Sequence, residues 1–188
     1  AVAVMDNVER AVTTDCKREG NLVYIVGTTR NELGGSQYYD IHGYVGNKVP
    51  RVDPKKGKKL MDALSTATEK CLVKACHDLS EGGIGVAVAE MAFAGDLGIV
   101  IHLERVPLGE AMDRDDYVLF SESNTRFLVE VASEDRRKFE NIMAGVDFAA
   151  IGQVTSKEKL EVYGLNGEMV LSAPVAELKE AWQKPLRW

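Results

Sequence analysis

Apolar positions in the first half of the chain follow two different spacings, which predict a strand and a helix. Residues 21–27 (N-L-V-Y-I-V-G) form a short apolar run that is rich in β-branched side chains and ends in glycine, as in a buried strand. Further along, apolar side chains recur at helical spacing, and Asp53 followed by Pro54 is typical of a helix start. We therefore predict a helix at residues 54–72, with Leu60, Leu64, Ala67 and Cys71 on its inner face.

The middle of the chain predicts an interior helix next to strands. Residues 84–94 are almost wholly apolar and are followed by Gly95, a common helix stop. A helix that is apolar on all sides belongs in the interior of a domain. Ser133, followed by two acidic residues, predicts a capped helix start. The predicted elements here are a helix at 84–94, strands at 98–103 and 126–131, and a helix at 133–143.

The C-terminal part predicts a hairpin and a last helix. Asn166-Gly167 is the strongest short hairpin signal, and it separates strand-like runs at 160–163 and 169–171. Pro174 opens a helix that continues through Trp182. Because helices are mixed with isolated strands and with a hairpin, we predict an α+β fold, a layered domain with a mixed sheet rather than a doubly wound one. The length of 188 residues fits a single domain over residues 1–188.

Composition and charge exclude several classes of protein. Apolar residues make up 45% of the chain and charged residues 28%, which is ordinary for a folded globular domain. The net charge of -6 argues against nucleic acid as a partner, because binding along a phosphate backbone needs clustered Lys and Arg. We interpret the densest basic run as a solvated helix face, with a small phosphate ligand as the alternative. That run consists of Lys55, Lys56, Lys58 and Lys59.

Neither the cysteines nor the ends of the chain indicate export or a membrane. No apolar stretch approaches the ~20 residues of a membrane span, and the N-terminus lacks the layout of a signal peptide, so we expect a cytoplasmic protein with no membrane partner. The three cysteines form neither a C-x-x-C pair nor a zinc quartet with the histidines, which predicts reduced, partly buried thiols. The chain opens with Ala1 and in mid-pattern, so we expect a fragment of a longer chain.

The first group of candidate functional residues is 77–83 (H-D-L-S-E-G-G), directly before the apolar helix. Paired glycines let a backbone approach a ligand, and the free N–H groups of a helix start attract phosphate. The alternative is structural: Asp78 caps the helix, and Glu81, three residues later, completes a capping box. The residues leave both interpretations open. His77 is either a general base or a hydrogen-bonded core histidine, and we favour the second.

Two further loops carry polar groups. Residues 32–36 (E-L-G-G-S) contain a second glycine pair, which either cradles a phosphate or makes a turn, and the chain contains neither a Walker A string nor a dinucleotide fingerprint. Residues 121–126 (S-E-S-N-T-R) place hydroxyls, an amide, a carboxylate and a guanidinium close together. Such a set fits polar ligand recognition or, as the alternative, a solvated loop with a salt bridge. We interpret the acidic run at 113–116 as solvated rather than as a metal site.

In this order, the three loops resemble the aminoimidazole ribonucleotide synthetase superfamily, and H-D-L-S-E-G-G resembles the form found in phosphoribosylformylglycinamidine synthases. A-E-M-A-F-A-G at 89–95, F-S-E-S-N-T-R-F at 120–127 and I-G-Q-V at 151–154 also resemble the final domain of that family. The resemblance spans nearly the whole chain. It implies the C-terminal domain of an ATP-dependent ligase of purine biosynthesis, inactive when isolated, whose ligand sites lie at junctions between domains.

Members of that family convert formylglycinamide ribonucleotide, ATP and glutamine-derived ammonia into formylglycinamidine ribonucleotide. The resemblance therefore implies ATP and Mg²⁺ as cofactors, held mainly by upstream synthetase domains of the same chain, and a separate glutaminase subunit and a small bridging subunit as partners. The alternatives are a scaffold or structural-nucleotide-binding half of the same enzyme, or the equivalent domain of a sister enzyme.

The resemblance assigns no catalytic residue and no metal ligand to this chain, but it implies a ligand-facing role for the S-E-S stretch of the third loop. Together with the glycine loops, it predicts a substrate- or nucleotide-binding set. The predicted residues are Glu32, Gly34, Gly35, Ser36, His77, Asp78, Ser80, Glu81, Gly82, Gly83, Ser121, Glu122, Asn124 and Arg126.

Overall fold

One seven-stranded sheet organises the chain, which we describe from a computed structural model covering residues 4–5 and 7–187. Ala1, on which the expected upstream continuation depends, lies outside the described residues. The strand order is β2-β4-β1-β5-β3-β6-β7. The strands are β1 (Leu22–Val26), β2 (Val73–Asp78), β3 (Gly98–His102), β4 (Phe127–Val131), β5 (Phe148–Thr155), β6 (Lys159–Tyr163) and β7 (Met169–Pro174).

The sheet is mixed, which confirms the predicted α+β class. The β3–β6 pair is parallel, and every other neighbouring pair is antiparallel. The helices are α1 (Gln37–Ile41), α2 (Pro54–Glu69), α3 (Gly83–Gly95), α4 (Asp115–Phe120), α5 (Arg136–Met143) and α6 (Val175–Gln183). Short 3₁₀ turns lie at η1 (Val8–Arg10), η2 (Leu103–Arg105), η3 (Ser133–Asp135) and η4 (Lys184–Leu186).

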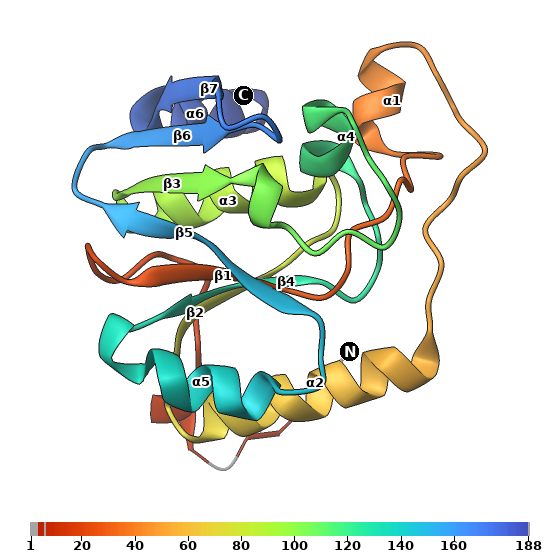
Figure 1. Ribbon diagram of the computed structural model, residues 1–188. Coiled ribbons are helices and arrows are strands. Elements are labelled where there is room, and N and C mark those ends of the chain that lie inside the picture. The colour runs from red at the N-terminus through yellow and green to blue at the C-terminus, as the bar shows by residue number, and fades with distance from the viewer. Residues whose placement is uncertain (1–3, 6, 188) are drawn as a thin grey trace.

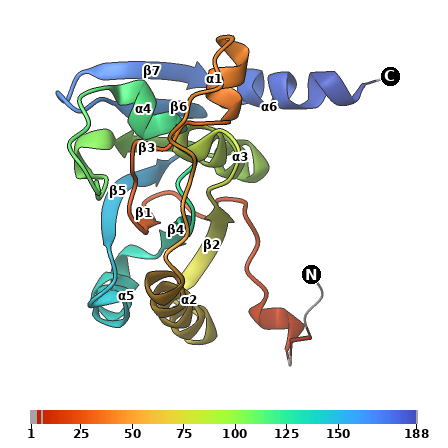
Figure 2. The same ribbon diagram turned by 90° about the vertical axis from the view of Figure 1, so that its right-hand side faces the viewer.

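Helices cover both faces of the sheet, because side chains on a strand point alternately to opposite faces. On β1, Val23 and Ile25 pack into the core under α3, whereas Tyr24 and Val26 pack into the core under α2 and α5. Figures 1 and 2 show α2 and α5 side by side on one face and α3 on the other. The apolar helix predicted for residues 84–94 is α3, which packs on the central strands but is not wholly interior, because Val86 and Ala94 are exposed.

Several predicted boundaries are confirmed by their local geometry. The Asp53 side chain caps α2 by accepting hydrogen bonds from the backbone N–H groups of Lys55 and Lys56, both at 3.1 Å. The helix α3 ends at Gly95, followed by Asp96 in the left-handed region. The hairpin joins β6 to β7 around Gly167, whose φ is +79°.

Other predictions were wrong. Strand β2 was missed, and it contains His77 and Asp78, which therefore do not belong to a turn before α3. Gly82, at φ +75°, is the N-cap of α3 and provides no side-chain cap, so the capping box from Asp78 and Glu81 is absent. Strand β5 was also missed. The helix predicted for 133–143 begins as a 3₁₀ turn, and the Ser133 hydroxyl donates to the Gly20 carbonyl at 2.6 Å instead of capping it.

The three cysteines are free, as predicted, but their exposure differs. Cys16 is buried and Cys76 is partly buried, whereas Cys71 is exposed. Burial raises the pKa of the Cys16 thiol to about 12 and the pKa of the Cys76 thiol to about 11. The prediction of partly buried thiols is therefore wrong for Cys71. This residue lies just beyond the end of α2, at φ +57°.

Candidate functional site

The loop at residues 121–126 is built around a buried arginine. The Arg126 guanidinium is only 1% exposed, and it donates to the carbonyls of Ser121 and Ser123 at 2.6 and 2.8 Å and to Thr29 Oγ1 at 2.9 Å. Burial lowers the pKa of Arg126 to about 10, against the raising effect of the nearby Glu32 and Glu122 carboxylates. The alternative of a solvated loop with a salt bridge is therefore wrong.

The two serines of this loop hold it against the segment that follows β1. Ser121 Oγ donates to the Arg30 carbonyl at 2.6 Å, and the Arg30 N–H donates to Ser123 Oγ at 3.0 Å. Both serines are fully buried. Ser121 thus contributes to the site by fixing the backbone rather than by presenting a free hydroxyl.

Glu122 joins the three predicted loops. Its Oε1 accepts from the N–H of Gly82 at 2.9 Å and from the N–H of Gln37 at 3.0 Å, and its own N–H donates to the Glu32 carbonyl at 3.2 Å. Three loops, of which the first and last are about ninety residues apart in the sequence, therefore meet at one carboxylate. A charged acceptor for backbone N–H groups is a strong hydrogen-bonding arrangement.

Close backbone contacts account for one glycine of each pair. Gly83 has φ +57° and packs closely against the 121–126 loop. A Cβ at this position would be 2.2 Å from the Ser121 carbonyl oxygen. A Cβ on Gly34 would be 2.8 Å from the backbone of Lys48. Gly35, at φ +75°, has open space around it. The pairs therefore allow loop packing at Gly34 and Gly83 and a left-handed turn at Gly35.

Glu32 carries the one buried polar atom of this assembly that has no hydrogen-bond partner among the described residues. The residue is 8% exposed, and its Oε1 accepts from the Arg51 N–H at 3.3 Å. Its Oε2 is buried and has no hydrogen-bond partner among the described residues. A buried carboxylate oxygen without a partner is costly, and a bound donor would satisfy it. We call the assembled residues the polar loop cluster: Glu32, Gly34, Gly82, Gly83, Ser121, Glu122 and Arg126.

Other predicted residues lie elsewhere or have different contacts. His77 Nε2 lies 2.7 Å from Glu90 Oε2 on α3, and Glu90 Oε1 accepts from Trp182 Nε1 at 3.0 Å. His77 is thus hydrogen-bonded, as favoured from the sequence, but it is only partly buried and does not belong to the core. Ser80 and Glu81 are exposed, and Ser80 Oγ donates to Asp78 Oδ2 at 2.6 Å. Ser36 caps the short helix α1.

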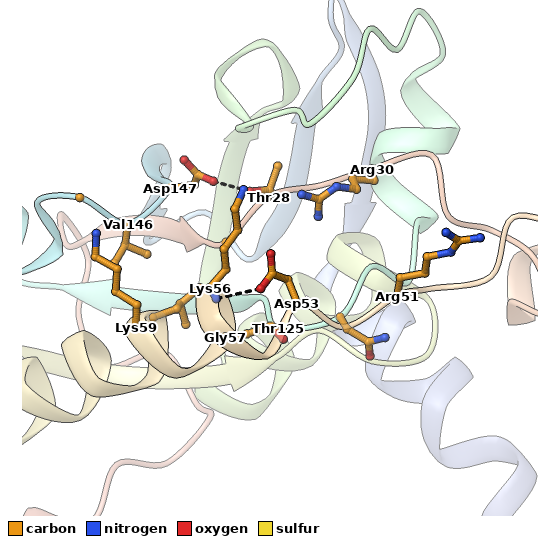
Figure 3. A pocket seen from close by; sticks show the side chains of 14 residues that line it. Thr28, Arg30, Arg51, Asp53, Lys56, Gly57, Lys59, Thr125, Val146 and Asp147 are labelled. Carbon is orange, nitrogen blue, oxygen red and sulfur yellow. Dashed lines mark hydrogen bonds between the residues drawn. The ribbon is translucent and has the colours of Figure 1, made fainter.

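A cavity of about 260 Å³ lies beside the polar loop cluster, between the end of β1 and the start of α2. We call it the basic pocket; Figure 3 shows its side chains. Of the predicted residues, the exposed Asn124 lines it. Prediction from sequence missed the others, although the basic run was noticed. We interpreted this basic run as a solvated helix face. That interpretation fits Lys58, which pairs with Asp62 at 2.6 Å, but it does not describe Lys56 and Lys59 fully, because both line the pocket.

The acidic run does not form a metal site in the part of the chain that the structure describes. Its last two residues open α4, and Asp116 binds the Arg114 guanidinium and the Tyr38 hydroxyl. Across residues 4–5 and 7–187, no group of three or more His, Cys, Asp or Glu side chains is arranged to hold a metal ion. Within the same residues, no helix has the length and apolar character needed to cross a membrane.

Similar proteins support the resemblance seen in the sequence. The phosphoribosylformylglycinamidine synthase subunit PurL of Thermococcus sibiricus is 38% identical over 172 residues, which are 91% of this chain and 23% of that protein. The corresponding subunit of Limosilactobacillus reuteri is 37% identical over 186 residues, or 98% of this chain and 24% of that protein. The chain therefore spans about a quarter of the length of these curated relatives.

Solved structures of Thermotoga maritima PurL have the same fold. The complex with FGAR has a TM-score of 0.80 at 27% identity, covering 91% of this chain and 30% of that one. The structure of PurLQS has a TM-score of 0.78 at 25% identity, and the match covers 91% of this chain and 28% of that one. The family described as AIR synthase related protein, C-terminal domain, matches residues 18–164. This match covers most of the chain, so the chain belongs to the AIR synthase related family and contains its C-terminal domain.

Proposed function

We propose that this chain is the C-terminal domain of a phosphoribosylformylglycinamidine synthase, the ATP-dependent ligase that makes formylglycinamidine ribonucleotide. The observation that carries this proposal is the likeness to PurL along nearly the whole chain, in sequence and in fold. The solved relative was complexed with FGAR, which is consistent with a site for that substrate in the complete protein.

The polar loop cluster is our candidate for this domain's share of the ligand site. Glu122 joins the three loops and Arg126 binds Thr29, while Glu32 has a buried carboxylate oxygen with no hydrogen-bond partner among the described residues. Such preorganised polar groups position a ligand in a site from which water is excluded. In this proposal Glu32 contacts the ligand, while Ser121 and Arg126 position the loops.

The nucleotide and metal are assigned mainly to other domains of the complete protein. A Thermotoga maritima PurL complexed with ATP supports ATP as the nucleotide. By the family resemblance, we propose that Mg²⁺ is held mainly by upstream domains of the complete protein. The match to the PurLQS structure supports separate partner subunits, which we propose to be a glutaminase and a small bridging protein in the cytoplasm.

The proposal is tested by assaying the natural protein that contains this chain. Ammonium replaces glutamine as the nitrogen donor, which removes the need for a glutaminase, and formylglycinamidine ribonucleotide and ADP are measured separately. We expect both products in equal amounts, and only when formylglycinamide ribonucleotide is present. ATP hydrolysis without the amidine product, by a protein that unfolds cooperatively on heating, would contradict the proposal.

A structural role is the second candidate, because most polar groups of the cluster are already satisfied within the chain. Ser121, Glu122 and Arg126 each bind another segment of the chain, at Arg30, Gln37 and Thr29. In this alternative the ligand stabilises the complete protein without being turned over. A nucleotide that raises the melting temperature but is recovered unchanged would favour it.

A further inference from the structure

We propose that the basic pocket binds the phosphate group of a small phosphorylated metabolite of about sugar-phosphate size. This site goes beyond the proposed function, which concerns the polar loop cluster and does not involve this cavity. Four basic side chains line the pocket, although the whole chain carries a net charge of -6. They come from two separate parts of the chain: Arg30, Arg51, Lys56 and Lys59.

Among the described residues, none of the four cations has a carboxylate partner. No ion pair within 4.0 Å involves any of them in the described part of the chain, whereas Lys58 on the same helix pairs with Asp62. Figure 3 shows Lys56 and Lys59 extending from the start of α2, Arg30 extending from the segment after β1, and Arg51 at the edge. Unpaired positive charges in a concave site attract anions, because the low-dielectric walls focus their field.

The two carboxylates that line the same pocket already accept hydrogen bonds from the chain. Asp53 accepts hydrogen bonds from the N–H groups of Lys55 and Lys56 as the cap of α2. Asp147 Oδ2 accepts from Thr28 Oγ1 at 2.6 Å. Two acidic groups against four basic ones leave an excess of positive charge. Because Asp53 occupies the first N–H groups of α2, the anion is held by side chains and not by the helix end.

The shape of the pocket limits the size of the ligand. A Cβ on Gly145, which has φ +88°, would lie 2.9 Å from Lys59 Nζ, so glycine leaves space for that ammonium group. The cavity of about 260 Å³ is smaller than the ~300–1,000 Å³ typical of pockets for drug-sized ligands. It therefore suits a phosphate with a sugar-sized group attached. Arg30 supplies a planar guanidinium for phosphate oxygens, and Asn124 at the rim supplies an amide.

The test is calorimetric titration of the 188-residue chain with ribose 5-phosphate, inorganic phosphate and ribose, at about 50 mM salt so that screening is modest. We compare Lys56→Ala/Lys59→Ala with a matched control, Lys55→Ala/Lys58→Ala. Both double variants remove two exposed lysines from the start of α2, but only the first removes lysines that line the pocket. Thermal unfolding of each variant checks that it is folded.

We expect ribose 5-phosphate to bind, inorganic phosphate to bind more weakly, and ribose to give no heat of binding. The Lys56→Ala/Lys59→Ala variant should lose about tenfold or more in affinity for ribose 5-phosphate, and the control should stay within about twofold. Equal losses in both variants would show diffuse attraction to surface charge and overturn the site. Absence of binding to the folded wild-type chain up to about 10 mM would also overturn it. Neither result depends on ligase activity, so it is separate from failure of the proposed function.

Discussion

Replacing Gly83 with valine is expected to destabilise the chain by at least about 3 kcal/mol. Gly83 has φ +57°, and any Cβ there would be 2.2 Å from the Ser121 carbonyl oxygen and 2.8 Å from the Leu119 carbonyl oxygen. Both neighbours are backbone atoms, so the contact cannot be relieved by a side-chain rotation. For a domain of this length, the melting temperature should fall by roughly 6–12 °C. Thermal unfolding followed by circular dichroism measures it.

Gly35 provides the matched control for Gly83. Its φ is +75°, and nothing lies within 4 Å of the position a Cβ would occupy. Gly35→Ala should therefore cost only the backbone strain of a left-handed residue, about 1–2 kcal/mol. If Gly83→Val is no more destabilising than Gly35→Ala, the close packing of the start of α3 against the 121–126 loop is wrong.

Replacing Arg126 with methionine has the second large expected effect, a loss of about 3–5 kcal/mol in the free energy of unfolding. The side chain is 1% exposed, and its removal leaves the carbonyls of Ser121 and Ser123 without these donors. It also removes the buried positive charge near Glu32 and Glu122. Methionine retains most of the volume, so the loss reports on hydrogen bonds and charge. Urea unfolding measures the change.

Arg137 is the control for Arg126, because it is an exposed arginine on α5. Arg137→Met should change the free energy of unfolding by no more than about 0.5 kcal/mol. If Arg126→Met is as mild as Arg137→Met, the buried arginine does not organise the loops, and the arrangement of the polar loop cluster is not supported.

Local patterns were sufficient for the elements whose signals are local. The cap at Asp53, the apolar run of α3 and the Asn166-Gly167 turn each predicted an element that the structure contains. Strands β2 and β5 were missed because tertiary pairing stabilises them. His77 and Asp78 look like a polar turn in sequence, yet they pair with Leu128 and Phe127 of β4. Strand propensity depends on such neighbours more than on the residue itself.

The sequence predicted which loops form the candidate site, but not the role of each side chain in it. The glycine pairs and S-E-S stretch indicated the loops that meet at Glu122. Which side chains are buried depends on contacts between residues far apart in sequence, such as Ser121 with Arg30. The sequence could not separate Lys56 and Lys59, which line the basic pocket, from Lys55 and Lys58, because this depends on where α2 packs.

We propose that Glu32 of the polar loop cluster contacts the ligand of an ATP-dependent ligase. The most direct test of this proposal is the kcat/KM for formylglycinamide ribonucleotide of the natural protein carrying Glu32→Gln, which keeps the Oε1 acceptor for the Arg51 N–H but removes the charge. Glu69→Gln, at an exposed position at the end of α2, is the control. We predict a fall in kcat/KM of about tenfold or more for Glu32→Gln, as expected for a lost charged hydrogen bond, and no change for Glu69→Gln. A folded Glu32→Gln variant with wild-type kcat/KM would contradict the claim.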